Sequence, residues 1–158
     1  MRKFKSAGSA AILVGLLASA APAPAQAQQP PGWIADPRTG CRLWNNYPGP
    51  DDRITWDGPC VGGFGQGHGI LHWFAAGRPD DEVDDGDFAQ GKLEGHGVVA
   101  RANGRHFDGQ FHDNKPNGQG TLRDSDGKIY TGIWVNGCFA QGNRRSYFFT
   151  TATECSAK

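Results

Sequence analysis

The residues best suited to chemistry lie in GFGQGHGILHW, residues 63–73, where glycine alternates and His68 and His72 stand four apart. Histidine is a common metal ligand, and two histidines at this spacing face one another on a helix. Alternating glycine opposes a helix, and on a strand four residues span about 13 Å, from a rise of about 3.3 Å per residue. The two histidines cannot share an ion there, so we predict no metal site. The glycines also lack the G-x-x-x-x-G-K-[ST] pattern of a phosphate-binding loop, and we predict no cofactor.

The acidic run DDEVDDGD, residues 80–87, could attract calcium. It departs from the EF-hand pattern because Val83 occupies a ligand position. We therefore interpret the run as a solvated insertion loop and keep calcium binding as the alternative.

Residues for catalysis are scarce. Beyond the N-terminal segment the serines are Ser125, Ser146 and Ser156, and none lies in a nucleophile motif. Carboxylates such as Asp87 and Glu94 could pair, but the sequence does not set the spacing that glycoside hydrolysis requires. We predict no catalytic residues and a protein that is not an enzyme.

The N-terminus has the three-part layout of a secretory signal peptide. Arg2, Lys3 and Lys5 precede the apolar run at residues 10–21, and Ala25-Gln26-Ala27 offers a cleavage site. We expect residues 1–27 to be removed and the protein to be exported, either to the periplasm or outside the cell. The precursor has 16 basic and 16 acidic residues, so losing three bases leaves 13 against 16. This mildly acidic charge argues against nucleic acid as a partner.

The four cysteines lie beyond the expected cleavage site, at Cys41, Cys60, Cys138 and Cys155. An even number of cysteines in an exported protein predicts two disulfides. At this point three pairings are open.

Residues 54–142 contain four copies of one pattern. An aromatic residue, a glycine two later, a second aromatic two later, a further glycine three later and a Gly-x-Gly pair recur at about 56–83, 84–106, 107–129 and 130–142. Asn114 replaces the middle glycine of the third copy. The last copy is truncated, Asp84 holds the first aromatic place of the second copy, and Cys60 holds the second aromatic place of the first. The recurrence of four glycines at fixed offsets indicates a repeat architecture.

Phe107-Asp-Gly-Gln-Phe111, the following Asn117-Gly-Gln-Gly120, and YTGIWVNG at residues 130–137 resemble MORN (membrane occupation and recognition nexus) repeats. The resemblance covers most of the chain beyond the signal peptide. It implies a protein that organises partners, in some cases at lipid surfaces.

The expected fold is all-β, an elongated single antiparallel sheet of repeated β-hairpins. Side chains alternate along a strand, so Phe107, Gly109 and Phe111 share one face. A ring on one strand can then cover a glycine on its neighbour, where no side chain competes. The predicted core is thin and comprises Trp56, Leu71, Phe88, Val99, Phe107, Phe111, Leu122, Tyr130 and Trp134. His68 and His96 occupy the same repeat position, and we expect both on one exposed face.

An open sheet has two vulnerable ends, and the cysteines lie at those ends. We predict local pairs, Cys41–Cys60 and Cys138–Cys155. The first would clamp an extended N-terminal segment and cap, residues 28–53. The second would clamp a C-terminal cap segment, residues 143–158. Each closes a loop of about 20 residues, which stabilises by roughly 3 kcal/mol in the chain-entropy argument.

The predicted function is non-catalytic binding or scaffolding of a protein partner that the sequence does not identify. The possible binding face is a row of rings, Phe88, Phe107, Phe111, Tyr130 and Trp134. The alternative is that these rings form only the core. A membrane surface has weak support, because basic residues are scattered apart from Arg144-Arg145. Two further alternatives are an envelope hydrolase acting on glycan with carboxylates on the groove, and a secreted effector or inhibitor.

Overall fold

The computed structural model describes residues 32–75 and 78–156. The predicted signal peptide and residues 28–31 lie outside the described residues. Within the described ranges, no helix combines the length and apolar character needed to cross a membrane.

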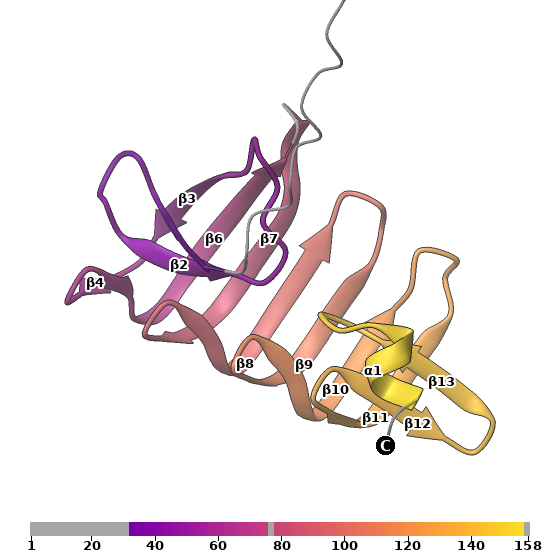
Figure 1. Cartoon of the computed structure of the whole chain (residues 1–158). Helices are drawn as coiled ribbons and strands as arrows, with labels where there is room; N and C mark the ends of the chain where they lie inside the picture. The colour runs from indigo at the N-terminus through magenta and orange to yellow at the C-terminus, as the bar shows by residue number, and fades with distance from the viewer. Residues whose placement is uncertain (1–31, 76–77, 157–158) are drawn as a thin grey trace, which may run out of the picture.

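The predicted hairpin array is confirmed as an antiparallel sheet of nine strands. Strands β6 to β13 lie in chain order, and β3 pairs with β6 at one edge (Figure 1). The strands are β3 (Arg53–Asp57), β6 (Gly67–Ala75), β7 (Arg78–Ala89), β8 (Lys92–Arg101), β9 (His106–His112), β10 (Lys115–Arg123), β11 (Ile129–Val135), β12 (Cys138–Gln141) and β13 (Arg144–Tyr147).

Tight two-residue turns close three of the hairpins. Gln90-Gly91 joins β7 to β8, Asp113-Asn114 joins β9 to β10, and Asn136-Gly137 joins β11 to β12. All six residues have positive φ. Turns with positive φ match the right-handed twist of the flanking strands. Asn and Gly adopt positive φ readily, which explains why they occur in these turns.

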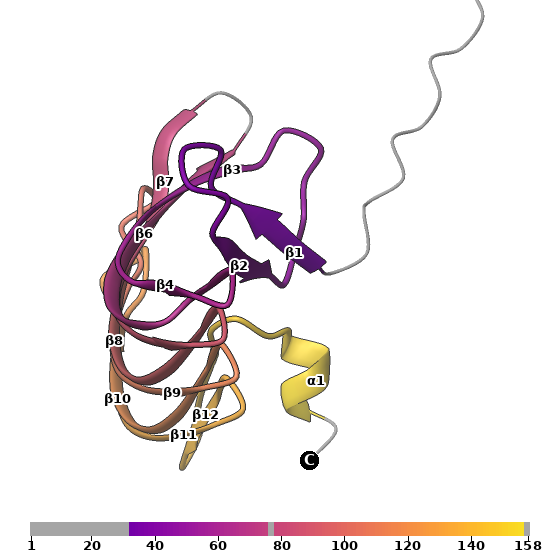
Figure 2. The same cartoon turned by 90° about the vertical axis from the view of Figure 1, so that its left-hand side faces the viewer.

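The N-terminal segment is more structured than the extended lead-in that the sequence predicts. It contributes to a second, four-stranded sheet in the order β1 (Gly32–Ala35), β2 (Arg42–Asn45), β5 (Phe64–Gly65) and β4 (Cys60–Val61). The pairing of β2 with β5 is parallel. Figure 2 shows the large sheet curved, with β1, β2 and the short helix α1 (Ala152–Ser156) on its concave side.

Glycines meet in register across six consecutive strands of the large sheet. They are Gly69, Gly86, Gly97, Gly109, Gly120 and Gly132, each opposite the next. We refer to this set as the glycine row. The buried core residues lie beside this row on the concave side. Buried and exposed residues alternate strictly along β9, where Phe107, Gly109 and Phe111 are buried between exposed residues.

Rings cover the glycine row as predicted. A Cβ placed on Gly120 would lie 2.4 Å from the Phe107 ring, and one on Gly69 would lie 2.3 Å from the Trp56 ring. Ring contacts then continue along the array, with Phe107 edge-on to both Phe111 and Trp134. The core is thus one layer of side chains lying on backbone.

Both predicted disulfides are present. Cys41 pairs with Cys60 at a Cα–Cα distance of 5.9 Å, and Cys138 pairs with Cys155 at 5.5 Å. The first joins the β1–β2 segment to the start of the repeats. The second ties α1 to β12, so each end of the array carries a covalently held cap.

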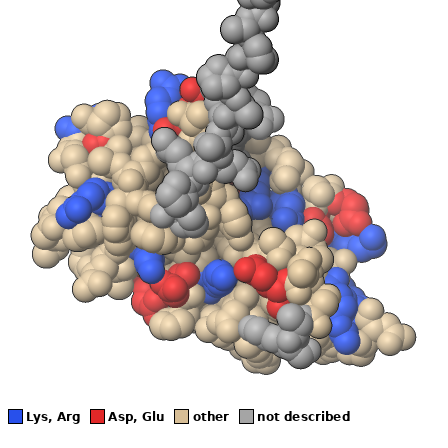
Figure 3. Space-filling model, in the orientation of Figure 1, with Lys and Arg blue, Asp and Glu red and all other residues tan. Residues whose placement is uncertain are grey.

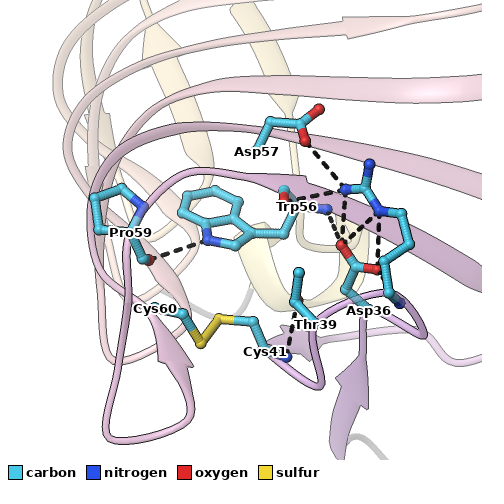
Figure 4. Close-up of polar contacts among 8 residues, drawn as sticks. Asp36, Thr39, Cys41, Trp56, Asp57, Pro59 and Cys60 are labelled. Atoms are coloured by element: carbon cyan, nitrogen blue, oxygen red, sulfur yellow. Dashed lines mark hydrogen bonds and ion pairs between the residues drawn. A yellow bond between two sulfur atoms is a disulfide. The ribbon is translucent and has the colours of Figure 1, made fainter.

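A buried carboxylate holds the N-terminal cap to the large sheet. Asp36 is fully buried and accepts hydrogen bonds from Arg38 and from the Trp56 backbone N–H at 2.8 Å. Figure 4 shows this carboxylate against Trp56, near the Cys41–Cys60 disulfide. The hydrogen bonds from Arg38 lower the pKa of Asp36 to about 2.

The glycine row gives a direct test of the core. A Cβ on Gly109 would lie 2.5 Å from the Gly120 Cα and 2.6 Å from the Gln119 carbonyl oxygen, so the backbone must move. We expect Gly109→Ala to lower the free energy of unfolding by about 2–3 kcal/mol, the usual cost of overpacking. Urea denaturation measures this. Gln110→Ala, on the exposed face, is the control, and equal effects of the two substitutions would contradict the arrangement.

The Asp36 contact predicts a pH dependence. Because the pKa of Asp36 is lowered, its contribution to the free energy of unfolding is complete above about pH 4 and is lost as the pH falls towards 2. We expect Asp36→Asn to cost about 2–3 kcal/mol at pH 7, since charged hydrogen bonds are lost, and the difference from wild type to shrink between pH 4 and 2. Asp57→Asn is the matched control, because exposed Asp57 also contacts Arg38, at 3.1 Å. Its expected cost is below about 1 kcal/mol.

Candidate functional site

Most of the rings predicted as a binding face lie in the core. Phe88, Phe107, Phe111 and Trp134 are 0–3% exposed, and Tyr130 is partly buried against them. Their place over the glycine row accounts for this burial. The structure therefore favours the core interpretation for these five residues, and an external partner would reach other parts of the concave side.

The histidines of the Gly-His-Gly motifs lie on the outer, exposed face, as expected. His68 lies 3.3 Å from Asp85 and 3.4 Å from Asp87, and His96 lies 3.0 Å from Asp108. These are exposed histidine–carboxylate contacts, and exposed contacts of this kind contribute little to stability. No group of three or more His, Cys, Asp or Glu in the described part of the chain is arranged to hold a metal ion.

The acidic run is a strand, which corrects the expectation of an insertion loop. It forms most of β7, paired on one side with β6 and on the other with β8. Strand alternation turns Asp85 and Asp87 to the exposed face and Asp84 to the interior. The run therefore divides between two faces of the sheet, which removes the basis for a calcium loop.

A cavity of about 200 Å³ is lined by residues of the large sheet and of both caps. Rings form much of its wall, and polar groups enter it from β7, β8 and the segment after β2. Its lining is Trp44, Asn45, Asn46, Tyr47, Asp52, Leu71, Trp73, Phe74, Ala75, Glu82, Asp84, Phe88, Gly91, Leu93, Arg101, Asn114 and Phe149. An apolar cavity with a few convergent polar groups is the usual form of a ligand site.

Asp84 is the most unusual group in this cavity. It stands where the other copies carry the first aromatic residue, Trp56, Phe107 or Tyr130. The side chain is buried, with only 4% of the residue exposed. Its Oδ2 accepts a hydrogen bond from the Trp73 Nε1–H at 2.9 Å, while Oδ1 has no hydrogen-bond partner among the described residues.

The charges around Asp84 are unbalanced. Glu82 lies two residues earlier on the same face and forms an ion pair with Arg101 on β8. Burial raises the pKa of Asp84 well above its usual range, and the Glu82 charge adds to the effect. Burial also raises the pKa of Glu82, while Arg101 opposes that rise. Burial thus favours the neutral form of Asp84, while Arg101 favours the charged form of Glu82.

Both caps supply walls to the cavity. The Trp44 backbone N–H donates to the Gly91 carbonyl at 2.8 Å, which docks β2 on the β7–β8 turn. From the C-terminal cap, Phe149 packs against the core, and the Arg101 guanidinium lies 4.9 Å from its ring. The cavity is therefore built from segments that two disulfides hold in place.

The sequence contained one signal of this site. Asp84 breaks the aromatic pattern of the repeats, and an acid at a core place must be either destabilising or functional. The ion pair of Glu82 with Arg101 left no such signal, because it depends on the register of β7 with β8. The contribution of Trp44 and Phe149 depends on how the caps fold over the sheet.

The buried acid predicts a pH-dependent stability. A raised pKa means that the fold favours neutral Asp84, so the contribution of this residue to stability is greatest below about pH 4 and falls as the pH rises through the pKa in the folded state. Asn mimics the neutral acid, and we expect Asp84→Asn to stabilise by about 1–2 kcal/mol at pH 8 and much less at pH 4. Urea denaturation at both pH values measures this. Asp85→Asn, on the exposed face, is the control, and an Asp84→Asn effect that is the same at pH 4 and 8 would contradict a neutral buried acid.

Comparison with known proteins agrees with the repeated hairpins. The MORN repeat family matches residues 85–104 and 107–129, which lie within the second and third copies of the sequence pattern. No curated protein matches the chain. These two matches span strands β8, β9 and β10 and the end of β7. Two consecutive segments of the hairpin array therefore match MORN repeats.

Proposed function

We propose that this protein is an exported, non-catalytic binding module that holds a protein partner at the concave-side cavity. The observation that carries the proposal is the unpartnered Oδ1 of buried Asp84, a residue that lines a cavity between two covalently held caps. A buried polar atom without a partner costs folding free energy, and a ligand that bonds to it would offset that cost. MORN repeats support a binding or scaffolding role in general terms.

A rigid frame favours this use of the cavity. The walls come from paired strands and from segments tied by disulfides, so little freedom is lost when a partner binds. A site that is formed in advance binds with less ordering cost than a loop that must fold around its ligand. The array then acts as a scaffold whose caps shape one recess.

Export has independent support. Two disulfides stabilise proteins in oxidising compartments and are rare in reducing ones. The basic, apolar and small-residue segments at the N-terminus fit a signal peptide. We propose the periplasm or the exterior of the cell as the location.

A protein is a better partner than a lipid surface. On the face shown in Figure 3, acidic and basic side chains are interspersed rather than gathered into one basic patch. Binding to anionic lipid depends on clustered Lys and Arg. The cavity also carries more acids than bases, which disfavours an anionic headgroup.

A second candidate, a glycan hydrolase, has one specific observation in its favour. Glu82 and Asp84 are neighbouring carboxyls in a cavity, and both have raised pKa values. Raised pKa values are typical of a general acid. Turnover of glycan or peptidoglycan substrates that is abolished by Asp84→Asn would support this candidate, and no turnover by the wild-type protein would remove it.

Site-specific photo-crosslinking tests the binding proposal. Tyr47 is 58% exposed and lines the cavity, while Ile133 is 56% exposed on the outer face of β11. We expect a benzoylphenylalanine at position 47, in protein expressed in its own cell envelope, to crosslink a discrete partner. The same group at position 133 is the matched control. Crosslinks from position 133 alone, or from neither position, would contradict the proposal.

A further inference from the structure

The carboxylates of the cavity outnumber its cations. Asp52, Glu82 and Asp84 line it, and Arg101 is the one cation among the described lining residues. Asp52 is already used, because its Oδ2 accepts from the Asn45 side chain at 2.8 Å and from the Gly49 N–H at 2.7 Å. Glu82 holds Arg101. Asp84 is left as the acid that a cation from outside could pair with.

The geometry of Asp84 favours a compact cation. Trp73 occupies Oδ2, and Oδ1 is buried with no hydrogen-bond partner among the described residues. A guanidinium binds best through two parallel hydrogen bonds to both oxygens of a carboxylate. An ammonium is a point charge with rotatable donors, and a single acceptor oxygen is enough for it.

The walls suit an alkyl stem that ends in a charge. Five aromatic side chains line the recess, namely Trp44, Tyr47, Trp73, Phe74 and Phe149. Lysine buries its methylene groups along such apolar surface while its charge finds a polar partner. Rings also attract ammonium groups directly, and the Lys92 ammonium already lies 4.9 Å from the Trp44 ring.

We propose that the cavity receives a lysine side chain of the partner protein, with its ammonium on the Asp84 Oδ1 and its stem against the surrounding rings. This inference rests on the proposed function and names the chemistry of the contact. The partner therefore presents an exposed lysine, which binds on the concave side as an anchor residue.

Binding and proton release are coupled in this site. An ammonium favours ionised Asp84, while the empty site favours the neutral acid, so binding expels a proton. The affinity should rise with pH by about tenfold per unit until the pKa of Asp84 in the free protein is passed. The charged and titratable groups that line this part of the cavity with Asp84 are Tyr47, Asp52, Glu82 and Arg101. Arg105 acts on Glu82 and Glu154 acts on Tyr47 through their charges, without lining the cavity.

The experiment titrates the full exported, disulfide-bonded protein with Nα-acetyl-lysine methylamide. Fluorescence of Trp73 and Trp44 and calorimetry in two buffers of different ionisation enthalpy report binding and proton release. We expect saturable binding that is tighter at pH 8 than at pH 5, with a proton released. Asp84→Asn should weaken binding by about tenfold or more, since it removes the charged partner, and Asp85→Asn should leave it unchanged.

Three comparison probes make the result decisive. The norleucine analogue has the stem without the charge, the arginine analogue has a guanidinium, and ethanolamine represents a lipid headgroup. Equal or tighter binding of any of them, or binding without proton release, overturns the inference. If the lysine analogue fails to bind while position 47 still crosslinks a partner, the inference fails and the proposed function stands. Thermal unfolding of Asp84→Asn shows that weakened binding does not come from loss of the fold.

Discussion

The contact between rings and bare backbone is the interaction on which the rest of this structure depends. Glycine occurs at corresponding places on six neighbouring strands, and rings such as Phe107 and Trp56 occupy the volume that side chains would otherwise fill. A glycine within a strand is normally a weakness, since it has no side chain to pack. Here a ring from the next strand replaces the missing contact. A single sheet can then carry a core without a second full layer to cover it.

That arrangement leaves the sheet open at both ends, and the caps follow from it. A strand at an open edge exposes backbone donors and acceptors, and the terminal rings lack neighbours on one side. The N-terminal cap is fixed by Cys41–Cys60 and by Asp36 on the Trp56 backbone. The C-terminal cap brings Phe148 onto the Phe107 ring, at 5.5 Å, and is fixed by Cys138–Cys155. Both caps lie on the concave side, so closing the ends also encloses the cavity.

The sequence predicted the parts of the fold that repeat. The offsets of glycine and aromatic residues gave the hairpins, the buried face of β9 and the exposed face of His68 and His96, because each depends only on local alternation. The disulfides were predictable because two of the four cysteines lie at each end of the array. The second sheet, the extent of β7 through the acidic run, and the Glu82–Arg101 pair were not predictable in this way. They depend on pairing between segments that share no repeat offset.

Position 84 shows why a departure from the repeat carries more information than the repeat itself. A ring there would continue the row of Trp56, Phe107 and Tyr130 and would bury apolar surface, which stabilises the fold. Asp84 instead places an acid in a site that opposes its charge and leaves Oδ1 without a partner. Arg101 does not explain this acid, because Glu82 already pairs with it. Groups that the fold alone would disfavour are concentrated at functional sites, where a ligand supplies the missing interaction. The regular copies of this array build the frame, and the irregular one places an acid with an unpartnered oxygen beside the cavity.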